Sequence, residues 1–322
     1  MLKVSQSGIL NVAGRVGRLT ERTIGKLARK NYYTAKAYYY YKLARADRRH
    51  KGPPPWLVYQ MGKVGSKTVT ESLKTAKIGR PIYHIHSLAT ETLDEIERKY
   101  KSFTHIGGDL KHFWRCQYIR MRLDRGLNNG EKWKILTLVR DPVARNLANF
   151  FQHIRVEPSG SDRQWKLKSE WHDFEITVSD NDTKELIEIF FKREEHDLPL
   201  IWFDRELKGI LDIDVYASDF PISKGYMIYE GKKADVLLIR LEDLNDCAAE
   251  AFKEFLNIDS LTLVSANVGG QKEYADIYRA VKDSIVFPEA YLDKIYSSKF
   301  AQHFYSEAEI EKFRAKWSKT RA

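Results

Sequence analysis

Residues 56–68 have the sequence WLVYQMGKVGSKT, in which an apolar run leads into a glycine-containing loop and then into a polar segment. The run Trp56–Gln60 predicts a short buried strand, Met61–Ser66 a loop, and Lys67–Lys77 a helix. A helix that begins directly after such a loop presents unpaired backbone N–H groups and the positive end of its dipole. The sequence therefore predicts a binding site for phosphate or a similar anion at this turn.

The side chains of this loop also suit an anion. The loop and the start of the helix hold two lysines, two hydroxyl groups and two glycines that let the backbone approach a ligand: Lys63, Lys67, Ser66, Thr68, Gly62 and Gly65. Short motifs of this kind recur by chance, so a plain strand–turn–helix with incidental glycines is the competing interpretation. Other parts of the sequence are needed to distinguish an anion site from a plain strand–turn–helix.

A nucleoside-triphosphate P-loop, with the pattern GxxxxGK[ST], is the nearest alternative. If residues 67–68 were its Lys-Thr pair, its two glycines would fall at Met61 and Ser66, and neither is glycine. Such enzymes also use an aspartate after a later buried strand to help hold Mg²⁺. The best later strand here, Lys134–Val139, is followed by Arg140, and an arginine suits an anion that is bound without a metal.

Outside the loop, predicted strands alternate with predicted helices. The strands are Ile82–His86, Lys134–Val139 and Asp235–Arg240, and the helices are Thr92–Lys101, Leu110–Arg125, Val143–Phe151, Glu242–Leu256 and the region beyond Glu273. This alternation predicts an α/β fold with a parallel sheet that is flanked by helices. Residues 155–182 are polar with scattered tryptophans, which predicts a loop or lid on the acceptor side of a site, or an insertion.

The net charge of +10 comes entirely from one end of the chain. Residues 1–50 hold twelve basic and two acidic residues, an excess of ten, so residues 51–322 are formally neutral. The high isoelectric point is therefore no sign that the main part of the chain binds nucleic acid, and no nucleic-acid partner is expected.

The same region differs in composition, and it divides the chain into two parts. Residues 1–50 are predicted to be a basic, tyrosine-rich helical extension, and residues 51–322 a single main domain, with the prolines of Pro53–Pro55 at the boundary. Apolar residues recur at helical spacing between Ile9 and Leu19, with arginines beside them. The extension can lie on an anionic membrane, contact nucleic acid or an acidic glycan, or pack on its own domain or a second subunit.

Composition also restricts the compartment. No stretch reaches the roughly 18–20 apolar residues of a membrane span, and residues 1–14 show no signal peptide. The two cysteines, Cys116 and Cys247, form no CxxC pair and no Cys/His cluster, which indicates a reducing compartment and no structural zinc. We expect a cytoplasmic protein without a metal ion, and peripheral membrane attachment through residues 1–50 is the alternative.

At residues 63–68 the chain resembles the 5′-phosphosulfate-binding loop of sulfotransferases that use 3′-phosphoadenosine 5′-phosphosulfate (PAPS). That loop has a lysine, a variable residue, a small residue and then two or three Ser/Thr residues. The residues that match are Lys63, Gly65, Ser66 and Thr68. Lys67 occupies a position that is commonly Ser or Thr, so one hydroxyl contact is replaced by a lysine.

A second match is residues 134–151, KILTLVRDPVARNLANFF, which resemble the 3′-phosphate-binding segment of the same family. Arg140 matches the family's arginine. The family's serine on the second helical turn is Ala148 here, and either Asn149 or Arg145 is expected to substitute for it.

A third segment, residues 236–256, resembles a later strand and helix of sulfotransferases that have a mainly structural role. The three segments together look closest to carbohydrate-type sulfotransferases and to bacterial capsular polysaccharide synthesis proteins. The resemblance implies a P-loop-like sulfotransferase fold and transfer of a sulfuryl group from PAPS to an acceptor hydroxyl, on a carbohydrate, with 3′-phosphoadenosine 5′-phosphate (PAP) as product. The residues it assigns to the donor are Lys63, Val64, Gly65, Ser66, Lys67, Thr68, Arg140 and Asn149.

In-line sulfuryl transfer needs a base for the acceptor hydroxyl and a cation for the leaving oxygen. The resemblance assigns Lys63 as the cation. The second predicted strand ends in His84 and His86, which alternate onto one face next to the loop. His86 matches the family's base best, and His84 is the second choice; either can instead be a hydrogen-bonded core histidine.

Two further segments are weaker candidates. His105 and Asp109 form a reserve acid–base pair, and residues 267–272 would close the 3′-phosphate pocket or form a plain loop. Two other classes of function also remain. One is a magnesium-dependent P-loop-type kinase or other nucleotide-binding enzyme, and the other is a non-catalytic glycan or membrane-surface binding protein that uses residues 1–50.

Overall fold

The computed structural model of the chain describes residues 32–49, 54–76, 79–101, 108–158, 164–169, 171–179, 183–259, 261–264 and 274–318. The expected helix between Ile9 and Leu19 lies outside these residues, as does the segment 267–272. The chain divides into two compact units, one made of residues 1–53 and 88–129 and the other of residues 54–87 and 130–322.

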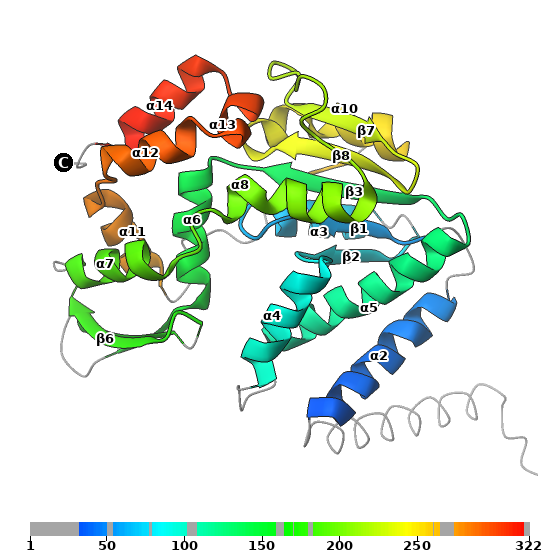
Figure 1. Ribbon diagram of the computed structural model, residues 1–322, viewed down its shortest axis with the longest axis horizontal. Coiled ribbons are helices and arrows are strands. Elements are labelled where there is room, and N and C mark those ends of the chain that lie inside the picture. Colours follow the sequence, from blue (N-terminus) through cyan, green and yellow to red (C-terminus); the bar gives the residue numbers. More distant parts are fainter. Residues whose placement is uncertain are drawn as a thin grey trace, which may run out of the picture. The chain divides into compact units, whose positions relative to one another are not determined.

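In the first unit the described residues form three helices, α2 (Tyr32–Arg49), α4 (Thr90–Lys101) and α5 (Gly108–Asn128). Helix α2 lies along α5 (Figure 1). Asp47 of α2 accepts a hydrogen bond from the Tyr118 hydroxyl at 2.6 Å and pairs with Arg122 at 2.8 Å. The Tyr32 ring packs edge-on against Trp114. The described part of the tyrosine-rich extension therefore packs on another helix of its own chain.

The second unit is built on a five-stranded sheet with the order β2–β1–β3–β8–β7. The strands are β1 (Trp56–Tyr59), β2 (Ile82–Ile85), β3 (Trp133–Val139), β7 (Tyr226–Glu230) and β8 (Ala234–Arg240). All neighbours pair in parallel except β7, which is antiparallel to β8. This confirms the expected α/β class with a mostly parallel sheet, and β7 is a strand that the sequence reading missed.

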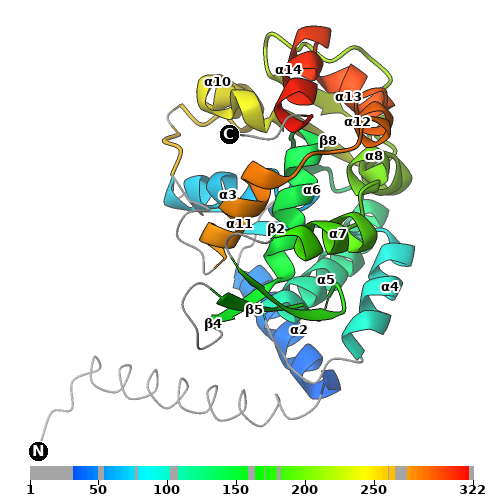
Figure 2. The same ribbon diagram turned by 90° about the vertical axis from the view of Figure 1, so that its left-hand side faces the viewer.

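Helices cover both faces of this sheet. Helices α3 (Ser66–Thr75) and α10 (Leu244–Leu256) lie on one face, whereas α8 (Leu198–Trp202) lies on the other (Figure 1 and Figure 2). Helix α8 continues through a π-helical turn, Phe203–Lys208, into the short helix α9 (Gly209–Leu211). The ring of Trp202 packs against Tyr59 of β1 with 5.1 Å between centroids, which fixes α8 to the sheet.

The polar stretch 155–182 is not simply a loop or lid. It contains a three-stranded antiparallel sheet of β4 (Arg155–Pro158), β5 (Gln164–Ser169) and β6 (Phe174–Ser179). Its strands alternate: Leu167 and Val178 are buried, while Lys166 pairs with Glu175 on the exposed side at 2.6 Å. Every second residue in these strands is polar, so their mean hydropathy is low although one face is buried.

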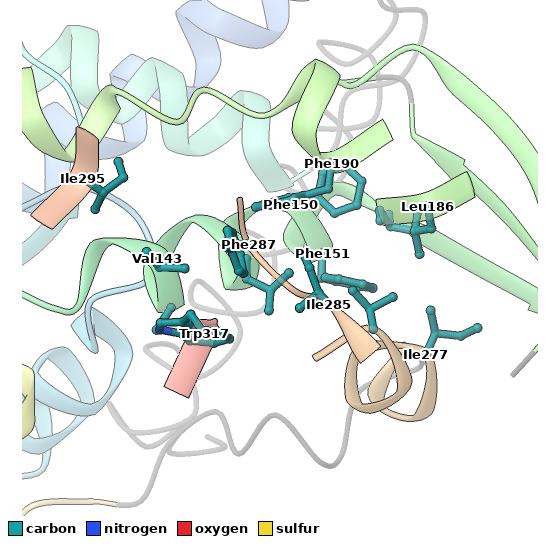
Figure 3. Packing of buried hydrophobic residues seen from close by; sticks show 14 of the residues in the cluster. Val143, Phe150, Phe151, Leu186, Phe190, Ile277, Ile285, Phe287, Ile295 and Trp317 are labelled. Carbon is teal, nitrogen blue, oxygen red and sulfur yellow. The ribbon is translucent and has the colours of Figure 1, made fainter. Parts of the chain in front are cut away.

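A hydrophobic cluster joins this small sheet to the helices around α6 (Pro142–Phe150) (Figure 3). The other helices in the cluster are α7 (Lys184–Arg193), α11 (Ala275–Ser284), α12 (Glu289–Tyr296), α13 (Lys299–Phe304) and α14 (Glu307–Trp317). Phe150 and Phe151, at the end of α6, are fully buried within it. Helix α6 is therefore held rigidly along its length, which matters because it carries much of the candidate site.

Among the residues that the structure describes, no helix combines the length and the apolar character that crossing a bilayer requires.

Candidate functional site

The strand order creates a topological switch point at β1. The chain leaves β1 for β2 on one side and later returns at β3 on the other side of β1. The segments that follow the carboxyl ends of β1 and β3 therefore diverge, and ligands of open α/β sheets bind in the crevice between such segments. The predicted anion loop follows β1, and Arg140 follows β3, so both lie at this switch point.

The loop after β1 turns sharply through two left-handed residues. Lys63 has φ 72° and Gly65 has φ 95°. Helix α3 begins directly afterwards at Ser66, one residue earlier than expected, and no side chain caps its first N–H groups. Ser66 is buried at the start of the helix, while Lys67 is exposed. The turn thus directs uncapped backbone donors and the positive helix end toward the switch point.

Two arginines hold the loop from the segment after β3. Arg140 donates from Nη1 to the Lys63 carbonyl at 3.0 Å, and Arg145 donates from Nε to the Gly62 carbonyl at 3.1 Å. Arg145 is 1% exposed, so its charge cannot reach a solvent-facing ligand. Arg140 is only partly buried, and its other guanidinium nitrogens form no hydrogen bond to any residue in the described ranges. Arg140 is therefore the arginine that can contact an anion.

Asn149, which the sequence placed at the 3′-phosphate, is engaged within the protein. Its amide nitrogen donates to Glu194 Oε1 at 3.0 Å, and the same carboxylate oxygen lies 3.5 Å from Arg145 Nη1. Burial raises the pKa of Glu194 to about 7, while Arg145 acts in the opposite direction. Burial lowers the pKa of Arg145. Glu194, which sequence reasoning missed, is therefore the partner that orients both residues of α6 toward the loop.

Asp141, next to Arg140, is fixed by hydrogen bonds from distant parts of the chain. Its carboxylate caps α6 through the Val143 N–H at 3.1 Å and accepts from Tyr296 at 2.8 Å and from Trp317 Nε1 at 2.9 Å. Its own N–H donates to Glu242 at 2.8 Å. The Arg-Asp-Pro turn is therefore rigid, and Arg140 projects from a fixed backbone.

His86 follows the end of β2 and lies beside the end of β1. Its Nδ1 is 2.7 Å from the Gln60 carbonyl, so Nδ1 carries the proton and Nε2 is the basic atom of the ring. The indole of Trp202 donates to the His86 carbonyl at 3.1 Å and fixes its backbone. The His84 ring meets the His86 ring edge-on at 4.6 Å. The geometry thus gives His86 the tautomer that a general base needs.

His153, which sequence reasoning did not select, lies near the same residues. Burial and then the charges of His172, Lys63, Arg145 and His86 lower its pKa to about 3. Lys63 and His86 therefore lie close enough to His153 for both to act on it. The only sequence signal was the four-residue spacing from Asn149, which would put the two residues on one side of a continuous α-helix. In the structure His153 instead lies in the 3₁₀ turn that follows α6.

The free energy of unfolding is expected to depend on His153 at acidic pH. The pKa of this imidazole is about 3 in the folded protein and the usual 6.5 in the unfolded chain, so the unfolded chain binds the proton more readily. Its contribution is present above pH 6.5 and is lost as the pH falls toward 3, by about 2–3 kcal/mol at about pH 4.5. Glu194 acts in the opposite direction between pH 4.5 and about 7, so the two effects offset in the wild type. Urea unfolding at both ends of this range should show that His153→Phe loses less stability on acidification. An equal loss in both proteins would contradict the low pKa.

Gly65→Ala is expected to destabilise the protein by about 2–3 kcal/mol, because a left-handed φ costs about 1–2 kcal/mol and crowding adds about 1. A Cβ at this position would lie 2.6 Å from Leu241 Cδ1. Gly79→Ala is the matched control, because Gly79 has φ +69° and no described atom within 4 Å of such a Cβ. Urea unfolding of both variants separates the two effects. Equal losses would mean that Leu241 does not constrain the loop.

The structure thus brings the residues that were expected to bind the donor, from Lys63 to Thr68 together with Arg140, to one switch point. Within the same unit it places His86 and Asn149 beside them. His105 and the side chain of Asp109 lie outside the described residues, as does the segment 267–272.

Residues 173–306 match a protein family described as "Putative capsular polysaccharide synthesis protein". The match covers less than half of the chain. It includes Glu194, Arg240 and Glu242, but neither the loop after β1 nor Arg140. The chain matches no curated protein and no solved structure. The chain is therefore similar, over residues 173–306, to a family linked to capsular polysaccharides. This similarity is compatible with a glycan-modifying role.

Proposed function

We propose that this chain is a sulfotransferase that moves a sulfuryl group from PAPS to an acceptor hydroxyl on a carbohydrate. The observation that carries the proposal is the contact between Arg140 and the Lys63 carbonyl, beside an uncapped helix N-terminus at the switch point of the sheet. This is the arrangement that the resemblance at residues 63–68 and 134–151 implies. The family match over residues 173–306 supports the glycan part of the proposal.

The residues present fit a donor with two separate phosphate groups. The first N–H groups of α3, with Ser66, Lys67 and Thr68, would hold the 5′-phosphate, since an uncapped helix start favours an anion. Arg140 would hold the 3′-phosphate with the guanidinium nitrogens that do not bind Lys63. Asn149 contributes indirectly, because it is bound to Glu194 and lies against Gly62.

The bound donor supplies an activated sulfuryl group with a phosphate leaving group. In the proposed mechanism His86 takes the proton of the acceptor hydroxyl at Nε2, since Nδ1 is already bound to the Gln60 carbonyl. Lys63 places its ammonium group beside the oxygen that gains negative charge as the donor leaves.

Asp141 argues against the magnesium-dependent kinase alternative. It is the acidic residue closest to the end of β3, but both of its carboxylate oxygens already accept hydrogen bonds, from Tyr296 and Trp317. A P-loop enzyme would need such a carboxylate to hold Mg²⁺.

Isothermal titration with PAP in the presence of EDTA, with ATP as the comparison, tests the proposal. Micromolar binding of PAP and little binding of ATP is the expected result. Binding of ATP that needs magnesium, without a preference for PAP, would overturn the proposal in favour of a kinase.

Arg140→Ala is expected to weaken PAP binding by about tenfold to a hundredfold, which is the loss expected for hydrogen bonds to a charged phosphate. The matched control is Arg279→Ala, which removes the same charge from an exposed arginine of α11 that pairs with Asp276. Titration calorimetry measures both. An affinity unchanged from the wild type would remove Arg140 from the donor site.

A further inference from the structure

Helix α6 and the turn that follows it carry three polar residues at four-residue spacing, Arg145 and Asn149 on the helix and His153 in the turn. The first two touch the loop after β1. Arg145 donates to the Gly62 carbonyl at 3.1 Å, and Asn149 Oδ1 lies 3.3 Å from where a Cβ on Gly62 would be. A 3₁₀ turn, Phe151–His153, continues the helix, so His153 lies roughly 7 Å further along the axis than Asn149.

The ring of His153 is held by stacking. It lies parallel to the Trp171 ring, with 5.0 Å between centroids and 19° between planes. The His172 ring meets it at 6.1 Å and 73°. The ring nitrogens of His153 form no hydrogen bond to any residue in the described part of the second unit. The protein therefore fixes the plane of a polar ring without using its donor or its acceptor.

The two ends of α6 are flanked by different polar residues. Arg140 precedes its first turn and holds the Lys63 carbonyl at 3.0 Å, whereas His153 follows its last turn. If the donor phosphates lie at the Arg140 end, then the acceptor approaches from the His153 end. The buried pair Glu194–Arg145 keeps the face between them rigid.

We propose that His153 binds the reacting hydroxyl of the acceptor through a ring N–H and that Trp171 positions this ring. This inference rests on the proposed function and names one side of the same site. The acceptor class is an un-ionised hydroxyl, of a sugar or of water. Because the ring stays neutral, His153 orients the hydroxyl and leaves the proton to His86.

The hydroxyl O–H bond breaks and its proton moves to His86 Nε2, while the hydroxyl oxygen forms the new S–O bond. The S–O bond to the donor phosphate breaks with its electron pair, which Lys63 stabilises. His153 gains and loses nothing, since it only donates a hydrogen bond to the attacking oxygen.

The experiment uses ³⁵S-labelled PAPS and the full chain, and it takes the sum of labelled glycan and labelled sulfate as the total PAP release. Dextran, alginate and desulfated heparin are supplied together, so transfer to a glycan and transfer to water are both counted. His153→Phe keeps the stacking on Trp171 but cannot donate a hydrogen bond. It should lower PAP release by about tenfold or more, while the dissociation constant of PAP stays within about twofold.

Four further variants serve as controls. His303→Phe removes another partly buried imidazole, which packs on Phe304 at 4.7 Å, and should leave release unchanged. His153→Gln retains an N–H donor and should restore most of the activity. Trp171→Phe should preserve release and Trp171→Ala should not, with thermal unfolding measured for each.

Release by His153→Phe within twofold of the wild type would overturn the inference. A PAP affinity that weakens as much as the rate would also overturn it, because His153 would then belong to the donor side. A wild type that neither binds PAP nor releases it would instead fail the proposed function, on which the inference depends.

Discussion

Lys63→Met should lower PAP release from PAPS by about two to three orders of magnitude, the loss typical of removing one charge-stabilising group from a transition state. Lys63 is the one charged residue that lies within the turn itself, at φ 72° between Gly62 and Gly65. Methionine keeps the length of the side chain and removes only the ammonium group. Because the contact from Arg140 goes to the Lys63 backbone carbonyl, the loop should keep its shape. Steady-state assays and PAP titration separate the rate from donor affinity.

The matched control is Lys74→Met, in the last turn of the helix that follows the loop. Lys74 is exposed and pairs with Glu71, so this variant changes the net charge equally without touching the turn. Its activity should equal that of the wild type. Full activity in Lys63→Met would remove this lysine from the mechanism.

His86→Asn should lower the rate by about two to four orders of magnitude, the range for loss of a general base. The asparagine amide can still donate to the Gln60 carbonyl that binds Nδ1 in the wild type, so the end of the strand should keep its place. What disappears is the basic Nε2. PAP binding should change little, because His86 is not among the residues proposed to hold the donor phosphates.

His84→Asn distinguishes the two histidines. The centroids of the two rings lie 4.6 Å apart. The contact with the Gln60 carbonyl that fixes a tautomer is made by His86. The rate should therefore fall far less in His84→Asn than in His86→Asn. The reverse order would make His84 the base, and equal small effects would place the base elsewhere.

The strand, the loop and the first turn of α3 could be predicted because their signals are local. An apolar run, two glycines and a following helical pattern lie within residues 56–75. The strand forms within one residue of its expected bounds, and the helix within two. The same holds for the strand that ends before Arg140. The edge strand Tyr226–Glu230 was missed because its burial does not follow the two-residue period of a strand: only Tyr226 and Tyr229, three positions apart, are buried.

The surroundings of the loop could not be predicted, because they depend on residues that are distant in sequence. Arg145 was expected to be able to contact a phosphate, but it is fully buried against Glu194. No local pattern pairs residues that are separated by about fifty positions. His153 likewise gains its environment from Trp171, in a turn between two strands that the sequence reading did not predict.

The hydrogen bonds to Asp141 have a consequence for how the protein matures during synthesis. The bond from Trp317 to Asp141 spans 176 positions of the chain. A ribosome therefore makes the turn that carries Arg140 long before it makes the indole that secures it. Until Trp317 has emerged, one carboxylate oxygen of Asp141 lacks this partner. A nascent chain thus completes this corner of the molecule last, so full rigidity at Arg140 comes only once the final helix is made.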